Sequence, residues 1–308
     1  MSDLLTLESV RSGGKAALAR ALARIEKAPD DTDVVDLLSE AYRSPVAHVA
    51  GMTGPPGVGK STLMNGLIHG WRSRGLTVAC IAVDPSSRRS GGALLGDRTR
   101  LATDPEDQGV FVRSMAARDR LGGLAGLTVQ AMVVMRALFD IVLVETVGVG
   151  QSETDVADVA DTVVLCVQPG SGDSLQFMKA GIAEIPHIIA VTKADMGAVA
   201  ERARADVVGA LSLSDAHDGW DVPVLLLSAE KRQGLDDLID AVDRHRGFLA
   251  EDGRLARARH AQASDWLIDA VRERFGRDGV RRAGYLGLDG EDTPFRRLSE
   301  VSRYLSPA

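Results

Sequence analysis

Gly54-Pro55-Pro56-Gly57-Val58-Gly59-Lys60-Ser61-Thr62 follows the apolar run 49–53 and fits the pattern GxxxxGK[ST]. Apolar residues at helical spacing come next, at Leu63, Leu67 and Trp71. Glycines in such a loop allow backbone N–H groups to converge on phosphate oxygens, and the N-terminus of the following helix adds a partial positive charge. The stretch predicts a phosphate-binding loop between a buried strand and a helix, as in the P-loop proteins of the α/β class.

Two side chains of this loop are predicted to act on the phosphates. Lys60 would bridge the β- and γ-phosphates, and Ser61 would give one oxygen ligand to Mg²⁺. The backbone of residues 54–62 would form the rest of the phosphate site. The alternative is a glycine-rich turn that binds no ligand, and the adjacent Lys60 and Ser61 argue against it.

Seven short apolar runs alternate with helical stretches around this loop. They cover residues 49–53, 77–83, 109–114, 140–145, 162–167, 188–192 and 223–228. Their apolar character is continuous, which is typical of strands whose two faces are both covered, so we expect a mostly parallel sheet. Helical spacing dominates both ends, which predicts a P-loop domain over 46–248 with helical extensions at 1–45 and 249–308.

Composition limits the partners and the compartment. The 308 residues carry a net charge of -7, so the overall field would repel nucleic acid, and none is expected as a partner. Cys80 and Cys166 lie in apolar runs and are expected to be buried thiols in a reducing compartment. Neither an apolar stretch of about 20 residues nor a signal-peptide pattern occurs, so we expect a cytoplasmic protein without a membrane contact.

Carboxylates stand at the ends of two predicted strands, at Asp84 and Glu145. The carboxyl ends of parallel strands share one crevice with the phosphate loop, so both acids are candidates for the surroundings of Mg²⁺. Glu145 also begins the segment 145–148, where GTPases usually carry Asp-x-x-Gly. For each acid alone, a helix cap or a solvated strand end is the alternative.

The segment Thr192-Lys193-Ala194-Asp195 matches three elements of the guanine-reading pattern Asn-Lys-x-Asp. Guanine offers N–H donors to a carboxylate, whereas adenine presents an acceptor at N1, so Asp195 favours GTP over ATP. The stem of Lys193 would cover the base, and a backbone N–H of Ser228-Ala229-Glu230 would reach the guanine O6 atom. A plain strand-to-helix turn is the alternative.

Two glycine-rich segments, 86–98 and 168–173, are candidates for parts that move when the nucleotide changes. Arg88, Arg89 and Arg98 are the arginines near enough in sequence to meet phosphate charge. A surface loop without such a role is the alternative for both segments.

Five segments across the predicted core are similar to those of one known family. They are GPPGVGKST at 54–62, VDPSS at 83–87, GDRTR at 96–100, ETVGVGQSE at 145–153 and GSGD at 170–173. The family is that of the MeaB/ArgK-type G proteins, GTPase chaperones of adenosylcobalamin-dependent acyl-CoA mutases, whose human member is tied to methylmalonic aciduria. The segment 145–153 is specific, because generic small GTPases share only its acid and Gly148.

The resemblance implies a Mg²⁺-dependent GTPase that gates the loading of cobalamin cofactor into a mutase and the removal of inactive cofactor. It implies that Asp97 joins Asp84 and Glu145 around the metal. It also implies that the loop 170–179 is a switch toward the mutase, in which Asp173 and Lys179 are candidates for coupling and for activation of hydrolysis.

The same resemblance implies a homodimer held by the helical extensions, which gives the segment 249–308 a dimerisation role. The family pattern has Asn where this chain has Thr192. We therefore expect a looser contact to the phosphate loop and an effect on nucleotide affinity more than on nucleotide identity.

Two rival functions use the same loop. A P-loop kinase of a small molecule or transport protein shares the lysine and the metal acid, although Asp195 argues against it. A metal-inserting GTPase would need clustered Cys or His ligands, and the histidines at 48, 69, 187, 217, 245 and 260 are scattered in the sequence.

Overall fold

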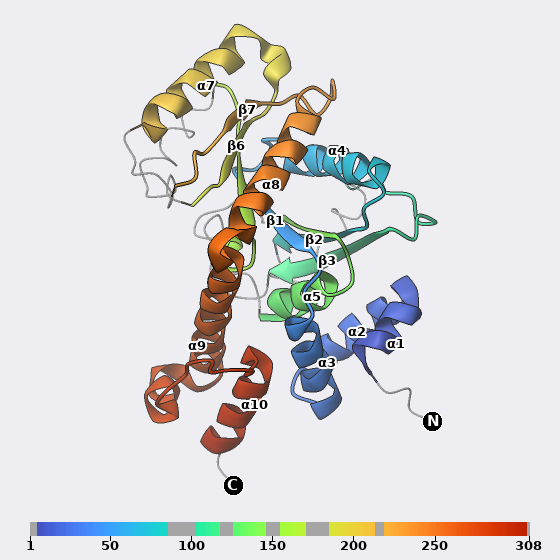
Figure 1. The fold of residues 1–308 in the computed structure, drawn as a ribbon, viewed down its shortest axis with the longest axis vertical. Coiled ribbons are helices and arrows are strands. Elements are labelled where there is room, and N and C mark those ends of the chain that lie inside the picture. Colours follow the sequence, from blue (N-terminus) through green and yellow to red (C-terminus); the bar gives the residue numbers. More distant parts are fainter. Residues whose placement is uncertain are drawn as a thin grey trace. The chain divides into compact units, whose positions relative to one another are not determined.

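The computed structural model describes residues 5–85, 101, 103–117, 126–145, 155–170, 185–212 and 219–306, without the side chains of residues 84, 85, 116 and 117. The chain forms two compact units. One contains residues 48–125 and 140–253, and the other contains residues 1–47, 126–139 and 254–308. We call them the sheet unit and the helical unit (Figure 1).

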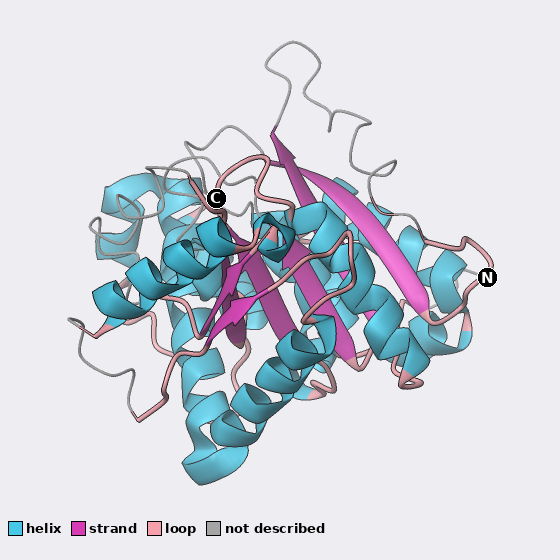
Figure 2. Ribbon diagram, turned by 90° about the horizontal axis from the view of Figure 1, so that it is seen from above, coloured by secondary structure: helices cyan, strands magenta, loops and turns pink. Residues whose placement is uncertain are grey.

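The sheet unit is built on a seven-stranded sheet with the order β3-β2-β4-β1-β5-β6-β7. The strands are β1 (His48–Thr53), β2 (Val78–Pro85), β3 (Val110–Ala117), β4 (Ile141–Glu145), β5 (Thr162–Val167), β6 (Ile188–Val191) and β7 (Val224–Leu226). Every pairing between these strands is parallel, and the strands are drawn in magenta in Figure 2. The predicted α/β class with a mostly parallel sheet is confirmed, and the seven apolar runs are its strands.

Helices cover both faces of this sheet, which explains why the strands are apolar without alternation. Helices α4 (Lys60–Ser73) and α8 (Leu235–Ala250) pack on one face, against side chains such as Val164 and Cys166 of β5. Helix α7 (Ala198–Leu211) packs on the other face, against Leu165 and Val167 of the same strand. Because successive side chains of a strand point to opposite faces, the residues from Val164 to Val167 meet an apolar layer on one face or the other.

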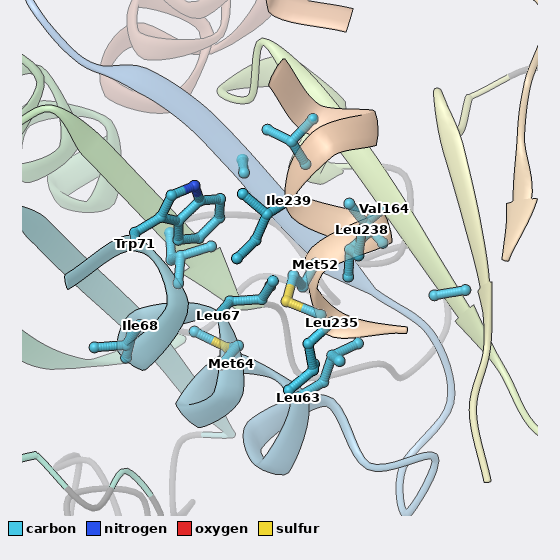
Figure 3. Close-up of a cluster of buried hydrophobic side chains, with 14 of the residues drawn as sticks. Met52, Leu63, Met64, Leu67, Ile68, Trp71, Val164, Leu235, Leu238 and Ile239 are labelled. Atoms are coloured by element: carbon cyan, nitrogen blue, oxygen red, sulfur yellow. The ribbon is translucent and has the colours of Figure 1, made fainter. Parts of the chain in front are cut away.

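The helix that follows the phosphate loop is held by its apolar face. Leu63, Leu67 and Trp71 of α4 are buried, as predicted from their spacing, and they meet Leu235 and Ile239 of α8 (Figure 3). Each such side chain contributes about 1.5–3 kcal/mol through burial. This packing fixes the direction of α4 and hence the position of its N-terminus, where the phosphate loop ends.

The helical unit contains α1 (Leu7–Ser12), α2 (Gly14–Lys27), α3 (Thr32–Arg43), α5 (Gly126–Arg136), α9 (Arg254–Ala283) and α10 (Pro294–Leu305). Its C-terminal part has its own apolar cluster, in which Leu267 and Val271 of α9 meet Leu298 and Val301 of α10. Among the described residues, no helix is long and apolar enough to cross a membrane.

Candidate functional site

The phosphate loop runs from the end of β1 to the start of α4, and three glycines give it its shape. Gly54, Gly57 and Gly59 have φ angles of 135°, 76° and 101°, which side chains rarely tolerate. A Cβ atom on Gly54 would lie 2.3 Å from the Cys166 carbonyl oxygen, so the loop begins in close contact with β5. Cβ atoms on Gly57 and Gly59 would meet nothing within 4 Å, which leaves open space beside the loop.

Lys60 is the buried cation of this loop. Its side chain is only 6% exposed, and its Nζ atom donates hydrogen bonds to the carbonyl oxygens of Gly54 at 2.7 Å and Pro55 at 3.2 Å. A lysine held among loop carbonyls is aimed at the loop interior, where a phosphate would sit. Its charge also opposes, in part, the effect of burial on Cys166, whose thiol pKa is raised to about 12.

Ser61 and Glu145 come together although β4 lies far along the chain. The Ser61 hydroxyl donates to the two carboxylate oxygens of Glu145, at 3.0 and 3.3 Å. Glu145 is 9% exposed and ends β4, the strand next to β1. The two metal candidates whose side chains the structure describes are thus adjacent, and both offer oxygen atoms.

The donor chemistry fits Mg²⁺, which prefers oxygen ligands and is usually held by one or two side chains together with phosphate and water. No cluster of three or more His, Cys, Asp or Glu side chains suited to a metal occurs in the described part of the chain. Asp84 belongs to β2, but its side chain is outside the described residues.

The candidate base-reading segment begins directly after β6. Asp195 accepts a hydrogen bond of 2.7 Å from the hydroxyl of Ser228, which follows β7. This hydrogen bond is the main reason why the pKa of Asp195 lies below its ordinary value. The carboxylate is exposed and therefore stays ionised, in position to accept hydrogen bonds from N–H groups of a base.

The backbone around the candidate O6 contact forms a tight turn. Ser228 and Gln233 exchange backbone hydrogen bonds of 3.1 and 2.9 Å, which closes the loop that carries Ala229 and Glu230. The Ser228 side chain is buried, whereas Glu230 is exposed. The sequence-predicted residues of the base site therefore come from two neighbouring strands, β6 and β7.

Two contacts hold this segment, and only that of Lys193 was not foreseen from the sequence. Lys193, with a φ angle of 55°, donates from Nζ to Gln168 Oε1 at 2.7 Å. The Thr192 hydroxyl lies 2.8 Å from the Val58 carbonyl oxygen inside the phosphate loop. Gln168 follows β5 directly, so attention to every polar residue at a strand end would have found it.

Several predicted residues lie outside the described part of the chain. They are Arg88, Arg89, Asp97, Arg98, Gly148, Asp173 and Lys179. Their roles stay predictions.

Both cysteines are free and buried, as expected from the sequence. Burial raises the pKa of the Cys80 thiol, and the charge of Glu145 acts in the same direction. These thiols stay protonated beneath the site and are not nucleophiles.

Known proteins resemble this chain in sequence, and a solved structure resembles it in fold. A protein of Pyrococcus abyssi assigned as a GTPase is 41% identical over 269 residues, which cover 86% of this chain and 82% of the relative. GTPase ArgK of Escherichia coli is 35% identical over 275 residues, or 87% of this chain and 83% of the relative. The crystal structure of a protein titled LAO/AO transport system kinase superposes with a TM-score of 0.69 at 26% identity, covering 97% of this chain and 96% of the other.

A family model decides the assignment. The model described as "Methylmalonyl Co-A mutase-associated GTPase MeaB" matches residues 18–281, which include the sheet unit, most of the helical unit and all described residues of the candidate site. The chain belongs to the MeaB family of P-loop GTPases.

Proposed function

We propose that this protein hydrolyses GTP with the help of Mg²⁺ and serves as a chaperone of an adenosylcobalamin-dependent acyl-CoA mutase. In this role it gates the loading of cofactor and assists the removal of inactive cofactor. The observation that carries the proposal is the pairing of Ser61 with Glu145 beside a phosphate loop, in a chain whose family is described as mutase-associated.

Guanine is the base that the candidate site fits best. The ionised Asp195 would accept hydrogen bonds from guanine N1–H and N2–H₂, and it would repel the N1 acceptor of adenine. The Ser228 hydroxyl fixes this carboxylate at 2.7 Å, which reduces the entropy lost when the base is bound. A backbone N–H of the turn at Ala229 and Glu230 would meet the guanine O6 atom.

Hydrolysis would consist of attack by water on the γ-phosphorus, with cleavage of the bond to the β-phosphate oxygen and release of GDP and phosphate. Lys60 and the loop N–H groups would stabilise the charge on the equatorial and leaving oxygens. Ser61 and Glu145, with Asp84 and Asp97, would hold Mg²⁺ directly or through water. Bound Mg²⁺ would neutralise charge on the β- and γ-phosphates.

The proposal includes three statements about the assembly. The protein is a homodimer in which the extension 249–308 takes part. Asp173 and Lys179 couple the nucleotide site to the mutase and activate hydrolysis. The location is cytoplasmic, because buried free thiols such as Cys80 suit a reducing compartment.

Phosphate release in the presence of purified mutases tests this function. The full chain is mixed with GTP, Mg²⁺ and each candidate, such as methylmalonyl-CoA mutase or 2-hydroxyisobutyryl-CoA mutase. We expect one of them to accelerate hydrolysis at least about tenfold and to co-purify with the chain. Lys179→Ala should abolish the acceleration but keep GDP affinity. If no mutase binds or accelerates hydrolysis, the chaperone role is wrong.

A kinase activity is the competing proposal, because the similar crystal structure carries a kinase title. The two differ in what accepts the phosphoryl group. A GTPase releases phosphate from GTP without any acceptor, whereas a kinase needs one. Stoichiometric, ATP-dependent phosphorylation of a small molecule or transport protein, with no acceptor-free release from GTP, would replace the GTPase proposal.

A further inference from the structure

Thr192 joins three backbone segments of the candidate site. Its hydroxyl oxygen lies 2.8 Å from the Val58 carbonyl oxygen of the phosphate loop and 3.1 Å from the Val167 carbonyl oxygen at the end of β5. The residue itself follows β6 and is 6% exposed, so these contacts are buried. One side chain thus connects the phosphate end of the site with the segment that reads the base.

The contact falls on Val58, a loop residue whose own side chain is buried in the apolar core of the sheet unit. Val58 stands between Gly57 and Gly59, both of which have left-handed φ angles. The Val58 N–H donates to the Pro55 carbonyl oxygen over a long 3.4 Å. The Thr192 hydroxyl donates to the Val58 carbonyl over a shorter 2.8 Å, and it sets the direction of that carbonyl.

A threonine hydroxyl has a single hydrogen to donate. Both neighbours of the Thr192 oxygen are carbonyl oxygens, which only accept, so that hydrogen is already committed to the protein. We propose that Thr192 is a positioning residue of the phosphate loop that makes no hydrogen bond to the base and therefore does not read the guanine N7 acceptor. This inference rests on the proposed guanine site and adds which base acceptor Thr192 leaves unread.

Asparagine at this position would behave differently, for a chemical reason. Its amide carries two N–H donors, so one can reach the Val58 carbonyl while the other remains for a base acceptor such as N7. Valine has the shape of threonine without the donor and would leave both carbonyls without this partner. Serine keeps the hydroxyl and loses only a methyl group.

Binding of GDP and 7-deaza-GDP to the full chain tests the proposal, with Thr192→Val, Thr192→Ser and Thr192→Asn as variants. The wild type should bind both nucleotides within about twofold. Thr192→Val should weaken both equally, by roughly five- to fiftyfold, because the loop loses its anchor. Thr192→Ser should restore both to within about threefold. Thr192→Asn should favour GDP over 7-deaza-GDP by about five- to tenfold.

Two results would overturn the inference. The first is that the wild type binds GDP at least about tenfold more tightly than 7-deaza-GDP. The second is that a folded Thr192→Val variant binds GDP as tightly as the wild type does. Thermal unfolding of each variant separates loss of fold from loss of binding, with the serine variant as the matched folded control. Wild-type binding of GDP against ADP is measured first. If GDP is not preferred, the guanine proposal fails, while an equal effect of Thr192→Val on both purines still supports the loop anchor.

Discussion

The phosphate end and the base end of the proposed nucleotide site are built in different ways. At the phosphate end the charged groups are buried, with Lys60 6% and Glu145 9% exposed, and a cation and an anion stand on neighbouring elements. At the base end Lys193 and Asp195 are exposed and are held by hydrogen bonds to Gln168 and Ser228.

This difference suits what each end would recognise under the proposed function. Charges in a water-poor environment interact strongly and need little reorganisation, which suits the stabilisation of a reacting phosphate. A base carries no net charge, so its recognition depends on the direction of hydrogen bonds, and an exposed but fixed carboxylate is sufficient. Substitutions at the phosphate end should therefore affect every nucleotide, and those at the base end should affect one base against another.

Lys60→Ala should have the largest effect. It removes the buried cation of the loop, and we expect hydrolysis of GTP to fall by about 10³-fold. Lys193→Ala is the matched control, since it removes an exposed lysine at the other end of the site, and it should cost less than about tenfold in kcat. Phosphate release at saturating GTP measures both. Equal losses in the two variants would contradict the contrast between the ends.

Glu145→Gln should come next. The amide keeps an oxygen that can accept from Ser61 but removes the charge, so we expect hydrolysis to fall by roughly 10- to 100-fold at saturating Mg²⁺. GDP affinity should change less than the rate of hydrolysis, because the charge of Glu145 matters most in the transition state, where charge develops. A variant with wild-type kcat at several Mg²⁺ concentrations would remove Glu145 from the proposed metal surroundings.

Asp195→Asn should change the preferred base without harming the phosphate end. Affinity for GTP should fall by roughly 10- to 100-fold, because guanine N–H donors lose their acceptor. Xanthosine triphosphate has a carbonyl where guanine has its amino group, so it should bind the variant better than GTP does. Titration calorimetry measures both nucleotides, and Asp206→Asn on α7 is the matched control. If Asp195→Asn lost the same affinity for GTP and for xanthosine triphosphate, Asp195 would not read the base.

Ser228→Ala should have the smallest effect, seen in the pH dependence of guanine preference. The Ser228 hydroxyl is the main cause of the lowered pKa of Asp195, so its removal should raise that pKa toward the ordinary value. The carboxylate form binds guanine, so the preference exists above the pKa and is lost as pH falls through it. The variant should lose the preference at a higher pH than the wild type, and affinity at neutral pH should fall only roughly two- to fivefold. The shift in that pH is measured from the ratio of GDP affinity to ADP affinity at several pH values from neutral to acidic. Asp195→Asn, which lacks the carboxylate, should show no such pH dependence.

Much of this architecture could be predicted from local patterns. The unbroken apolar runs predicted the strands to within about two residues at most ends, because burial on both faces requires apolar residues at consecutive positions. The loop 54–62 and the spacing of Leu63, Leu67 and Trp71 predicted the start and the buried face of α4. The division into units was less accessible, since residues 126–139 belong to the helical unit although they lie between two strands of the sheet.

The sequence by itself determined the sheet class and the phosphate loop, and it predicted the residue types that would favour guanine, because each depends on residues that are close in the chain. Only the tertiary structure decided which of these groups meet. Ser61 reaches Glu145 across 84 positions and Thr192 reaches Val58 across 134, because β1 lies between β4 and β5 with β6 beyond. Strand order brings the carboxyl ends of distant strands together, and apolar periodicity gives no information about that order.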